Sequence, residues 1–168
     1  MLFFKLPIRD KIALSVFSGF LGTLVMYLVG IPLYFLNISK LIYLIYAIEL
    51  FVTPEIARTT AGQISGGLVG LLVGGGLAFG FKLIIEWTGF DWIWIKALGY
   101  GAMIWFFWVG ITRNFLNVTM YIFDDLATNM ILLGQSELYI IATTYFMIKL
   151  AGSKEALQFG DRNRLKLR

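Results

Sequence analysis

The stretch AGQISGGLVGLLVGGGLAFGFKLII, residues 61–85, decides the fold, because it is long, apolar and rich in glycine. In water, each glycine costs a helix about 1 kcal/mol relative to alanine. In lipid, the backbone must satisfy its own hydrogen bonds, so the segment stays helical and its glycines form a groove against which another backbone packs. The segment therefore predicts a membrane-spanning helix in tight contact with a second helix, of this chain or of another copy. The glycines predicted to pack are a four-residue repeat and a further pair: Gly62, Gly66, Gly70 and Gly74, then Gly76 and Gly80.

The composition of the whole chain agrees with a membrane protein. Hydrophobic residues make up 59% of the 168 positions and charged residues 14%, against about 45–50% and about 25% in ordinary soluble domains. Long apolar runs account for the excess and leave no stretch of about a hundred residues for a separate soluble domain. We therefore expect one all-α, polytopic integral membrane domain covering residues 1–168.

Four apolar runs are predicted to span the membrane, because a helix needs about 20 apolar residues to cross it. The first is too long for the hydrophobic region of a signal peptide, which has about 7–15 residues, so we expect it to remain as a span. Gly30 and Pro32 predict a kink or an early end of that helix near Gly30. The predicted spans are 12–36, 61–85, 96–113 and 126–150.

Residues 41–52, LIYLIYAIELFV, form a shorter apolar stretch that is followed by Pro54. Its 12 residues are too few to cross the hydrocarbon core as a helix. We expect an interfacial or re-entrant helix, with Tyr43 and Tyr46 at the depth of the lipid headgroups. A fifth span that starts here is the alternative.

The connection EWTGFDWIWIK, residues 86–96, carries three of the five tryptophans. Tryptophan is enriched at membrane interfaces, where its ring and its N–H group each find a suitable medium. We predict that Trp87, Trp92 and Trp94 are interfacial anchors. A platform on which a ligand stacks is the alternative.

The distribution of Lys and Arg predicts the orientation. With four spans, both termini and the second connection lie on one side. That side carries eleven Lys and Arg residues, including Lys82 and Lys96, and the other side carries three: Lys40, Arg58 and Arg113. Because basic residues in short loops stay in the cytoplasm, we expect cytoplasmic termini. We expect the basic tail, residues 151–168, to contact anionic lipid of the bilayer and not nucleic acid.

The residue types present exclude several kinds of chemistry. The chain has no cysteine and no histidine, which excludes thiol catalysis and removes the usual zinc and haem ligands and the commonest general base. The glycines of 61–85 do not form a phosphate loop, because no Gly-Lys-Ser/Thr follows them. We therefore expect neither an enzyme, nor a metal site, nor a cofactor.

Glu137 is the only acidic residue deep within a predicted span, one residue from the midpoint of 126–150. Ionisable groups inside a membrane cost about 2.5–3.5 kcal/mol and are often functional. Three interpretations stay open: a protonated or hydrogen-bonded packing contact, a helix that begins near Leu133 and places Glu137 close to the outer surface, or a proton or cation site in a transport path. The candidate intramembrane polar site comprises Asn129, Gln135, Ser136 and Glu137.

Two further acidic residues, Asp124 and Asp125, precede the last span. Acidic residues at a helix start interact favourably with the helix dipole, so we interpret the pair as a cap. A cation site is the alternative, although adjacent helix residues do not face the same way.

Two segments resemble a known group of proteins. They are RDKIALSVFSGFLG at 9–22 and YGAMIWFFWVG at 100–110, together with the polar position in the last helix before IKL. These resemble small four-span membrane proteins of Firmicutes, the YqhR-like group and its clostridial relatives. The resemblance implies a bacterial inner-membrane setting and no catalytic activity. We therefore expect a non-enzymatic structural or accessory protein that packs, through its glycine-rich helix, with itself or with a larger membrane partner. An ion or proton transporter or channel subunit that uses Glu137 is the alternative.

Overall fold

The structure is a computed structural model that describes residues 10–111 and 125–151, and this part of the chain is all-helical, as expected. Four helices are long and apolar enough to cross a membrane, which confirms that part of the prediction. They are α1 (Lys11–Phe35), α4 (Thr60–Thr88), α5 (Ile93–Trp105) with its π-helical continuation η1 (Phe106–Ile111), and α7 (Leu126–Ala151). Two short helices, α2 (Tyr43–Glu49) and α3 (Pro54–Ala57), connect α1 to α4.

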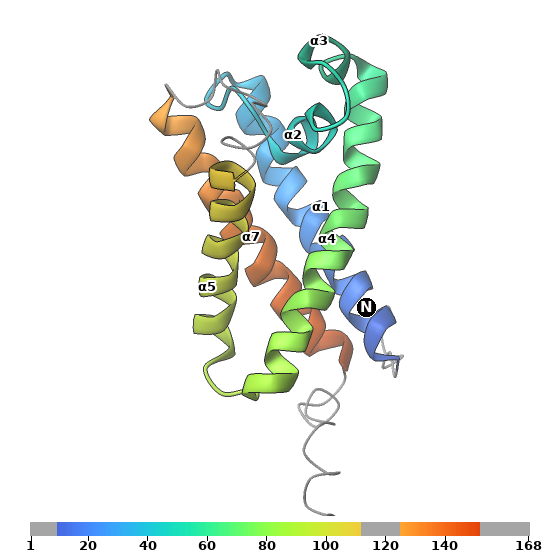
Figure 1. The fold of residues 1–168 in the computed structure, drawn as a ribbon, viewed down its shortest axis with the longest axis vertical. Helices are drawn as coiled ribbons and strands as arrows, with labels where there is room; N and C mark the ends of the chain where they lie inside the picture. The colour runs from blue at the N-terminus through green and yellow to red at the C-terminus, as the bar shows by residue number, and fades with distance from the viewer. Residues whose placement is uncertain (1–9, 112–124, 152–168) are drawn as a thin grey trace, which may run out of the picture.

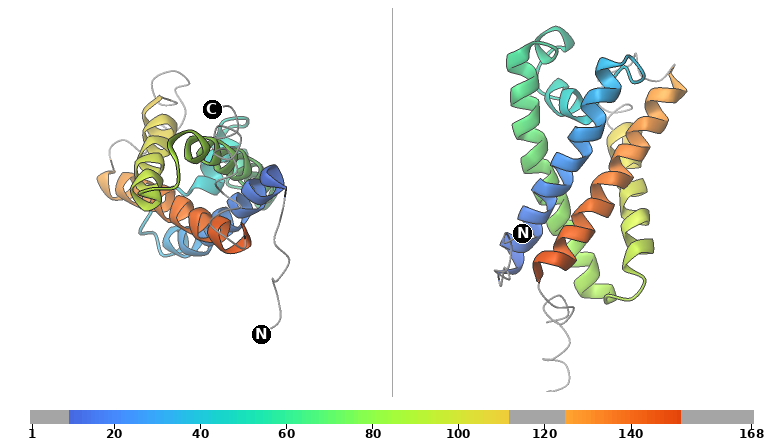
Figure 2. Two further views of the ribbon diagram at one scale, coloured as in Figure 1. Left: turned by 90° about the horizontal axis from the view of Figure 1, so that it is seen from below. Right: turned by 180° about the vertical axis from the view of Figure 1, so that it is seen from behind.

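The long helices run alternately up and down, so the start of α1 and the end of α7 lie at the same end of the bundle (Figures 1 and 2). α1 packs against both α4 and α7, and α7 packs in turn against α5. α4 and α5 make few contacts with each other beyond their short connection. At the end opposite the termini, α2 packs against α4 and reaches η1 through Tyr46, whose hydroxyl donates to the Trp108 carbonyl over 2.6 Å.

The start of α1 is capped by Asp10, whose carboxylate accepts a hydrogen bond from the backbone N–H of Ala13 over 2.7 Å. Of the two predicted possibilities, a kink or an early end near Gly30, the early end is wrong, because the helix continues through Pro32 to Phe35. Pro32 lies within the last turn, where it removes a single backbone donor, and its carbonyl still accepts from Leu36 over 2.9 Å. Its side chain is also exposed, so the ring displaces no neighbouring helix.

The repeated glycines of α4 face other helices of the same chain. A Cβ atom added at any of the four would overlap an atom of α1, α2 or α3, so each neighbour approaches to the distance that only glycine permits. The partner of this stripe, which the sequence left open, is therefore internal. The overlapped atoms are the Ile56 carbonyl oxygen at Gly62, the Leu44 carbonyl oxygen at Gly66, the Tyr27 hydroxyl at Gly70 and the Thr23 hydroxyl at Gly74.

The second glycine pair is divided between two environments. A Cβ atom at Gly80 would lie 2.8 Å from the Tyr100 hydroxyl of α5, so Gly80 also packs inside the chain. Gly76 lies on the outer face of α4, where an added Cβ atom meets nothing within 4 Å. Only Gly76 of the six predicted packing glycines is thus open to another molecule.

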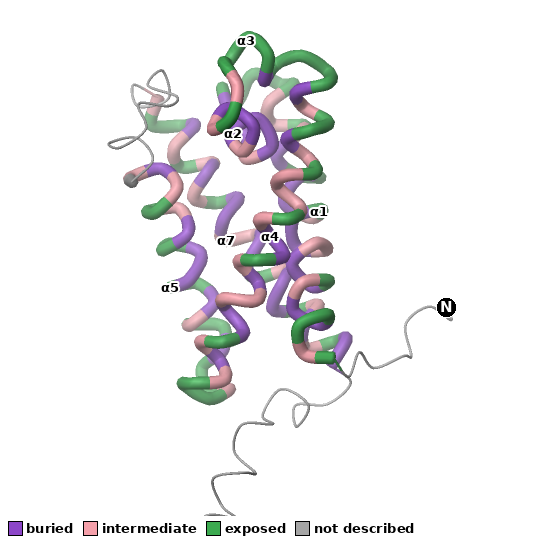
Figure 3. Tube along the Cα trace, turned by 45° about the vertical axis from the view of Figure 1, so that its right-hand side comes forward, coloured by how far each residue is buried: buried purple, intermediate pink, exposed green. Residues whose placement is uncertain are grey.

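Residues 41–52 are packed inside the bundle more fully than the sequence suggested. Leu41, Ile45 and Tyr46 are at most 3% exposed, and Figure 3 shows α2 as mostly buried and α3 as mostly exposed. Tyr46 therefore does not present its side chain to lipid headgroups, because its ring and hydroxyl are held against Trp108. A fifth span is also excluded, since α2 has only seven residues and is followed at once by α3.

The third long helix begins earlier than predicted, at Ile93 instead of Lys96. Trp92 precedes it with a left-handed φ of 57°, and Gly89 ends α4 with φ of 82°, so the chain reverses within a few residues. Several predictions concern residues that the structure does not describe. They are the end of the third span at Arg113, the capping role of Asp124, the basic residues before Asp10, and the basic tail beyond Ala151.

Candidate functional site

The three polar residues at the middle of α7 point in three directions, because consecutive helix residues lie about 100° apart. Gln135 is buried against α1, where a Cβ atom on Gly30 would lie 3.1 Å from its Oε1. Ser136 is also buried, and its hydroxyl donates to the Leu133 carbonyl over 2.8 Å. Glu137 reaches α5, where a Cβ atom on Gly101 would lie 2.7 Å from its Oε2. The predicted polar group is therefore not one site.

Glu137 lies in the contact between α7 and α5. Because α7 begins at Leu126, Glu137 is in the middle of the helix, and the interpretation in which the helix begins near Leu133 is wrong. Its Oε2 is buried without a hydrogen-bond partner among the described residues. The atoms closest to an added Gly101 Cβ are those of Glu137 and Ile140, so glycine makes room here for the carboxyl group.

Asn129 belongs to a polar cluster at the start of α7. Its side-chain amide donates to the Asp125 carbonyl over 3.1 Å, while the Thr128 hydroxyl donates to the Asp125 carboxylate over 2.7 Å. The Lys40 ammonium lies 3.5 Å from the same carboxylate. The hydrogen bond from Thr128 and the Lys40 charge hold the pKa of Asp125 below its usual range. These contacts agree with the cap interpretation of Asp125, and the described residues hold no group of three or more acidic side chains for a metal ion.

Asp125→Asn should lower the melting temperature at pH 7, because it removes the charge that Thr128 and Lys40 stabilise. A folded-state pKa below the unfolded value of about 3.9 means that the stabilisation is complete above that value and is lost as pH falls through the folded pKa. The gap between variant and wild type should therefore shrink below about pH 4. Thermal unfolding in detergent micelles measures this, with Asp91→Asn, an exposed residue of the α4–α5 connection, as the control. A gap that does not change with pH would contradict the assignment.

An ionic cluster joins the start of α1 to the end of α4, and the sequence analysis did not identify it. The Glu86 carboxylate lies 2.8 Å from the Lys82 ammonium and 3.1 Å from the Lys11 ammonium. Lys82, which we counted with the second connection, lies within α4, and its side chain is only 5% exposed. The signal available in the sequence was the four-residue spacing of Lys82 and Glu86, which places them on one face of a helix.

The three tryptophans predicted as anchors lie around the α4–α5 connection: Trp87 near the end of α4, Trp92 in the connection and Trp94 near the start of α5. Trp87, Trp92 and Trp94 are 86%, 77% and 47% exposed, so their side chains are available to an interface, and the anchor role stays a prediction. Lys96 lies in the first turn of α5, and its ammonium donates to the carbonyls of Thr88 and Gly89 over 3.1 and 2.9 Å. Lys96 therefore binds the last carbonyls of α4, as a basic residue at a helix end does.

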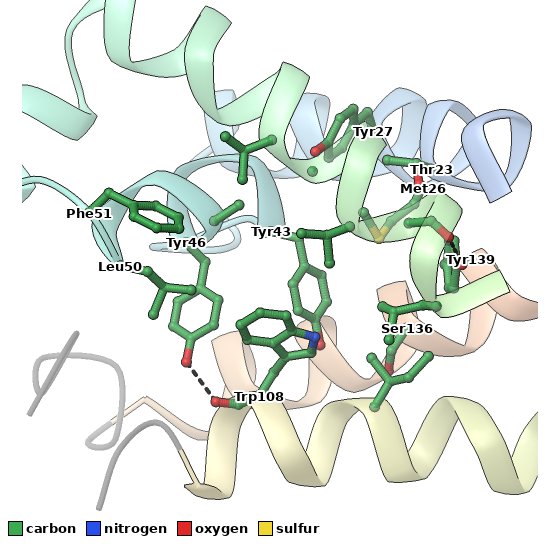
Figure 4. Close-up of a pocket in the computed structure, with 17 residues that line it drawn as sticks. Thr23, Met26, Tyr27, Tyr43, Tyr46, Leu50, Phe51, Trp108, Ser136 and Tyr139 are labelled. Carbon is green, nitrogen blue, oxygen red and sulfur yellow. Dashed lines mark hydrogen bonds between the residues drawn. The ribbon is translucent and has the colours of Figure 1, made fainter. Parts of the chain in front are cut away.

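A cavity of about 100 Å³ lies among α1, α2, α4, α7 and the end of the α5–η1 helix (Figure 4). Thr23 and Tyr139 line one end of the cavity, and Tyr46, Phe51 and Trp108 line the part next to α2. Gly74, whose carbonyl accepts from the Tyr139 hydroxyl, also belongs to the lining. None of its 17 lining residues is charged. Ser136 is the only member of the predicted polar site that contributes to this lining. The cavity has no signal in the sequence, because it depends on the packing of α2 between other elements.

Comparison with protein-family models, curated proteins and solved structures finds no match to this chain. The resemblance to the YqhR-like group therefore stays a prediction. A function has to rest on the geometry of the bundle, its two ends and its cavity.

Proposed function

We propose that this chain is a small, non-enzymatic integral membrane protein of the bacterial cytoplasmic membrane with a structural or accessory role. The observation that carries the proposal is the internal use of the glycine stripe, which joins α4 to α1, α2 and α3 and leaves an apolar outer surface. On the outer face of α4, for example, Leu68 and Leu72 are 61% and 69% exposed. A surface of this kind is stable when hydrocarbon or another apolar helix covers it.

The two ends of the bundle support the predicted orientation. Lys11, Lys82 and Lys96 lie toward the end that holds the start of α1 and the α4–α5 connection. Lys40 and Arg58 are the Lys and Arg residues that the structure describes at the end with α2 and α3. Under the bias of basic loops toward the cytoplasm, the first end is cytoplasmic and the α2–α3 end faces outward.

Self-association would use the outer face of α4 around Gly76. Small residues let two membrane helices approach closely, and Gly76 is the open glycine of this helix beside the exposed Leu72. We expect wild-type protein in mild detergent to be a dimer or part of a larger complex, and Gly76→Leu to lower its measured mass to that of a monomer. Light scattering coupled to size-exclusion chromatography measures the mass. The control is Gly99→Leu, at an open glycine of α5, which should leave the mass unchanged. A wild type that is monomeric and binds no partner would overturn this role.

A second candidate function is an ion or proton transporter or channel subunit that uses Glu137. The buried Oε2 without a hydrogen-bond partner favours it. Against it, Glu137 packs between α7 and α5 and is not among the residues that line the cavity. Proton and cation flux into proteoliposomes decides between the two candidates. Under the structural role, the wild type and Glu137→Gln both show no flux above that of empty liposomes, whereas flux that Glu137→Gln abolishes would establish transport.

A further inference from the structure

We propose that the cavity binds one hydrocarbon chain of a membrane lipid, taken from the leaflet on the α2 side. The inference rests on the membrane insertion in the proposed function and adds a ligand class to it. It follows from three observations: the depth of the cavity along the bundle, the chemistry of its lining and the position of its opening.

The cavity lies within the depth of one leaflet. Its deep residues Thr23, Gly74 and Tyr139 lie at or next to the midpoints of α1, α4 and α7. Its other end is closed by α2, near the end of the bundle opposite the termini. When the long helices span a hydrocarbon core of about 30 Å, the distance from their midpoints to one end is about 15 Å. This is the depth that the acyl chains of a single leaflet occupy.

The lining favours hydrocarbon over water or an ion. No lining residue is charged, and most lining hydroxyls already donate to carbonyl groups: Thr23 to Gly19, Tyr46 to Trp108, Ser136 to Leu133 and Tyr139 to Gly74. Among the hydroxyls that line the cavity, only those of Tyr27 and Tyr43 are buried without a hydrogen-bond partner in the described part of the chain. A buried water needs about 2–4 polar partners, so two hydroxyls are too few to hydrate the whole space. In another protein an apolar cavity of about 150 Å³ stays dry and binds benzene, so a cavity of this size suits part of an acyl chain.

We place the opening of the cavity between α4 and α5, which make few contacts with each other. The Tyr100 hydroxyl of α5 donates to the Leu77 carbonyl of α4 over 2.9 Å, which joins the two helices at the deep end. Beyond this bond toward α2, the α4 residues that line the cavity, Val69 and Val73, are only half-buried. Phe51, at the α2 end of the lining, is 72% exposed. A chain therefore enters sideways from the bilayer, without passing through an aqueous phase.

Photocrosslinking in proteoliposomes tests the proposal. The probe is a phosphatidylcholine that carries a diazirine near the methyl end of one acyl chain, and mass spectrometry locates the adducts. Lipid around the bundle should label exposed residues such as Leu68, while a chain in the cavity should also label Ile104 and Tyr139, which are 5% and 3% exposed. We expect Val73→Trp, which fills the cavity, to reduce the adducts at Ile104 and Tyr139 at least fivefold. Its matched control is Leu72→Trp on the exposed face of the same helix, which should leave those adducts unchanged.

The outcomes separate the lipid site from the membrane role. Adducts at Leu68 without adducts at Ile104 or Tyr139 would overturn the lipid site and leave membrane insertion intact. Equal loss of the buried adducts in Val73→Trp and Leu72→Trp would also overturn it. No adduct at any residue would overturn the membrane insertion on which the site rests. If Val73→Trp does not fold, the adduct map of the wild type still decides the question.

Discussion

Gly74→Leu should destabilise the bundle by about 3 kcal/mol or more, because side chains forced into a close-packed contact displace the backbones around it. Even a Cβ atom at this position would overlap the Thr23 hydroxyl of α1 and lie 3.4 Å from the Gly19 carbonyl oxygen. The Gly74 carbonyl also accepts the Tyr139 hydroxyl of α7, so separating α4 from α1 disturbs the contact with the fourth long helix as well. Unfolding in mixed micelles, followed by circular dichroism, measures the loss.

The control for this prediction is Gly76→Leu, two residues further along the same helix. It adds the same side chain at a position with no atom within 4 Å. At protein concentrations low enough to give monomers, we expect its free energy of unfolding to stay within about 0.5 kcal/mol of the wild type. Equal destabilisation by both substitutions would show that leucine disturbs α4 wherever it is placed. It would contradict the close contact between Gly74 and α1.

We expect the second largest destabilisation from Glu86→Gln, which should lower the free energy of unfolding by about 2 kcal/mol. The substitution leaves the Lys82 ammonium, 5% exposed, without its carboxylate at 2.8 Å. Breaking a buried ion pair from one side costs about 3–5 kcal/mol, and we expect less here because the Glu86 side chain is 21% exposed. Lys11 loses the same partner, but its side chain is 41% exposed and water can solvate it.

The double variant Lys82→Met and Glu86→Gln separates a stranded charge from a general disturbance of the helix end. Replacing both partners of a buried pair by uncharged groups is often neutral, so the double variant should recover most of the stability that Glu86→Gln loses. The free energy of unfolding in micelles measures both variants. A double variant no more stable than Glu86→Gln would show that the charge of Lys82 is not what Glu86 compensates.

The sequence predicted the long helices well, because three of their apolar runs are about 25 residues long and the fourth, 96–113, lies between two basic residues. It did not predict the packing of α2. The short length of residues 41–52 predicted a helix at the membrane surface. In the structure, the absence of a side chain at Gly66 lets the Leu44 carbonyl approach α4, so α2 packs inside the bundle. The hydrophobicity of residues 41–52 cannot predict this packing, because the packing depends on which glycine of α4 lies opposite the backbone of α2.

The polar residues of α7 show the same limit at the site. Gln135, Ser136 and Glu137 are consecutive in sequence, but they face different surroundings: Gln135 faces α1, Ser136 the cavity and Glu137 α5. The openings at Gly30 and Gly101 that receive Gln135 and Glu137 lie on other helices, at positions that the sequence of α7 cannot indicate. The cavity could not be predicted from the sequence either, since residues of six elements line it: α1, α2, α4, α5, η1 and α7.

The central claim is a four-span bundle with its termini in the cytoplasm and its α2–α3 end outside, and single cysteines test it most directly. Because the native chain has no cysteine, Glu55→Cys in α3 and Asp91→Cys in the α4–α5 connection each introduce one thiol at an exposed position. The measurement is labelling by a membrane-impermeant maleimide in intact protoplasts and after lysis. We expect Glu55→Cys to be labelled in intact protoplasts and Asp91→Cys only after lysis. The reverse pattern, or equal labelling of both in intact protoplasts, would contradict the claim.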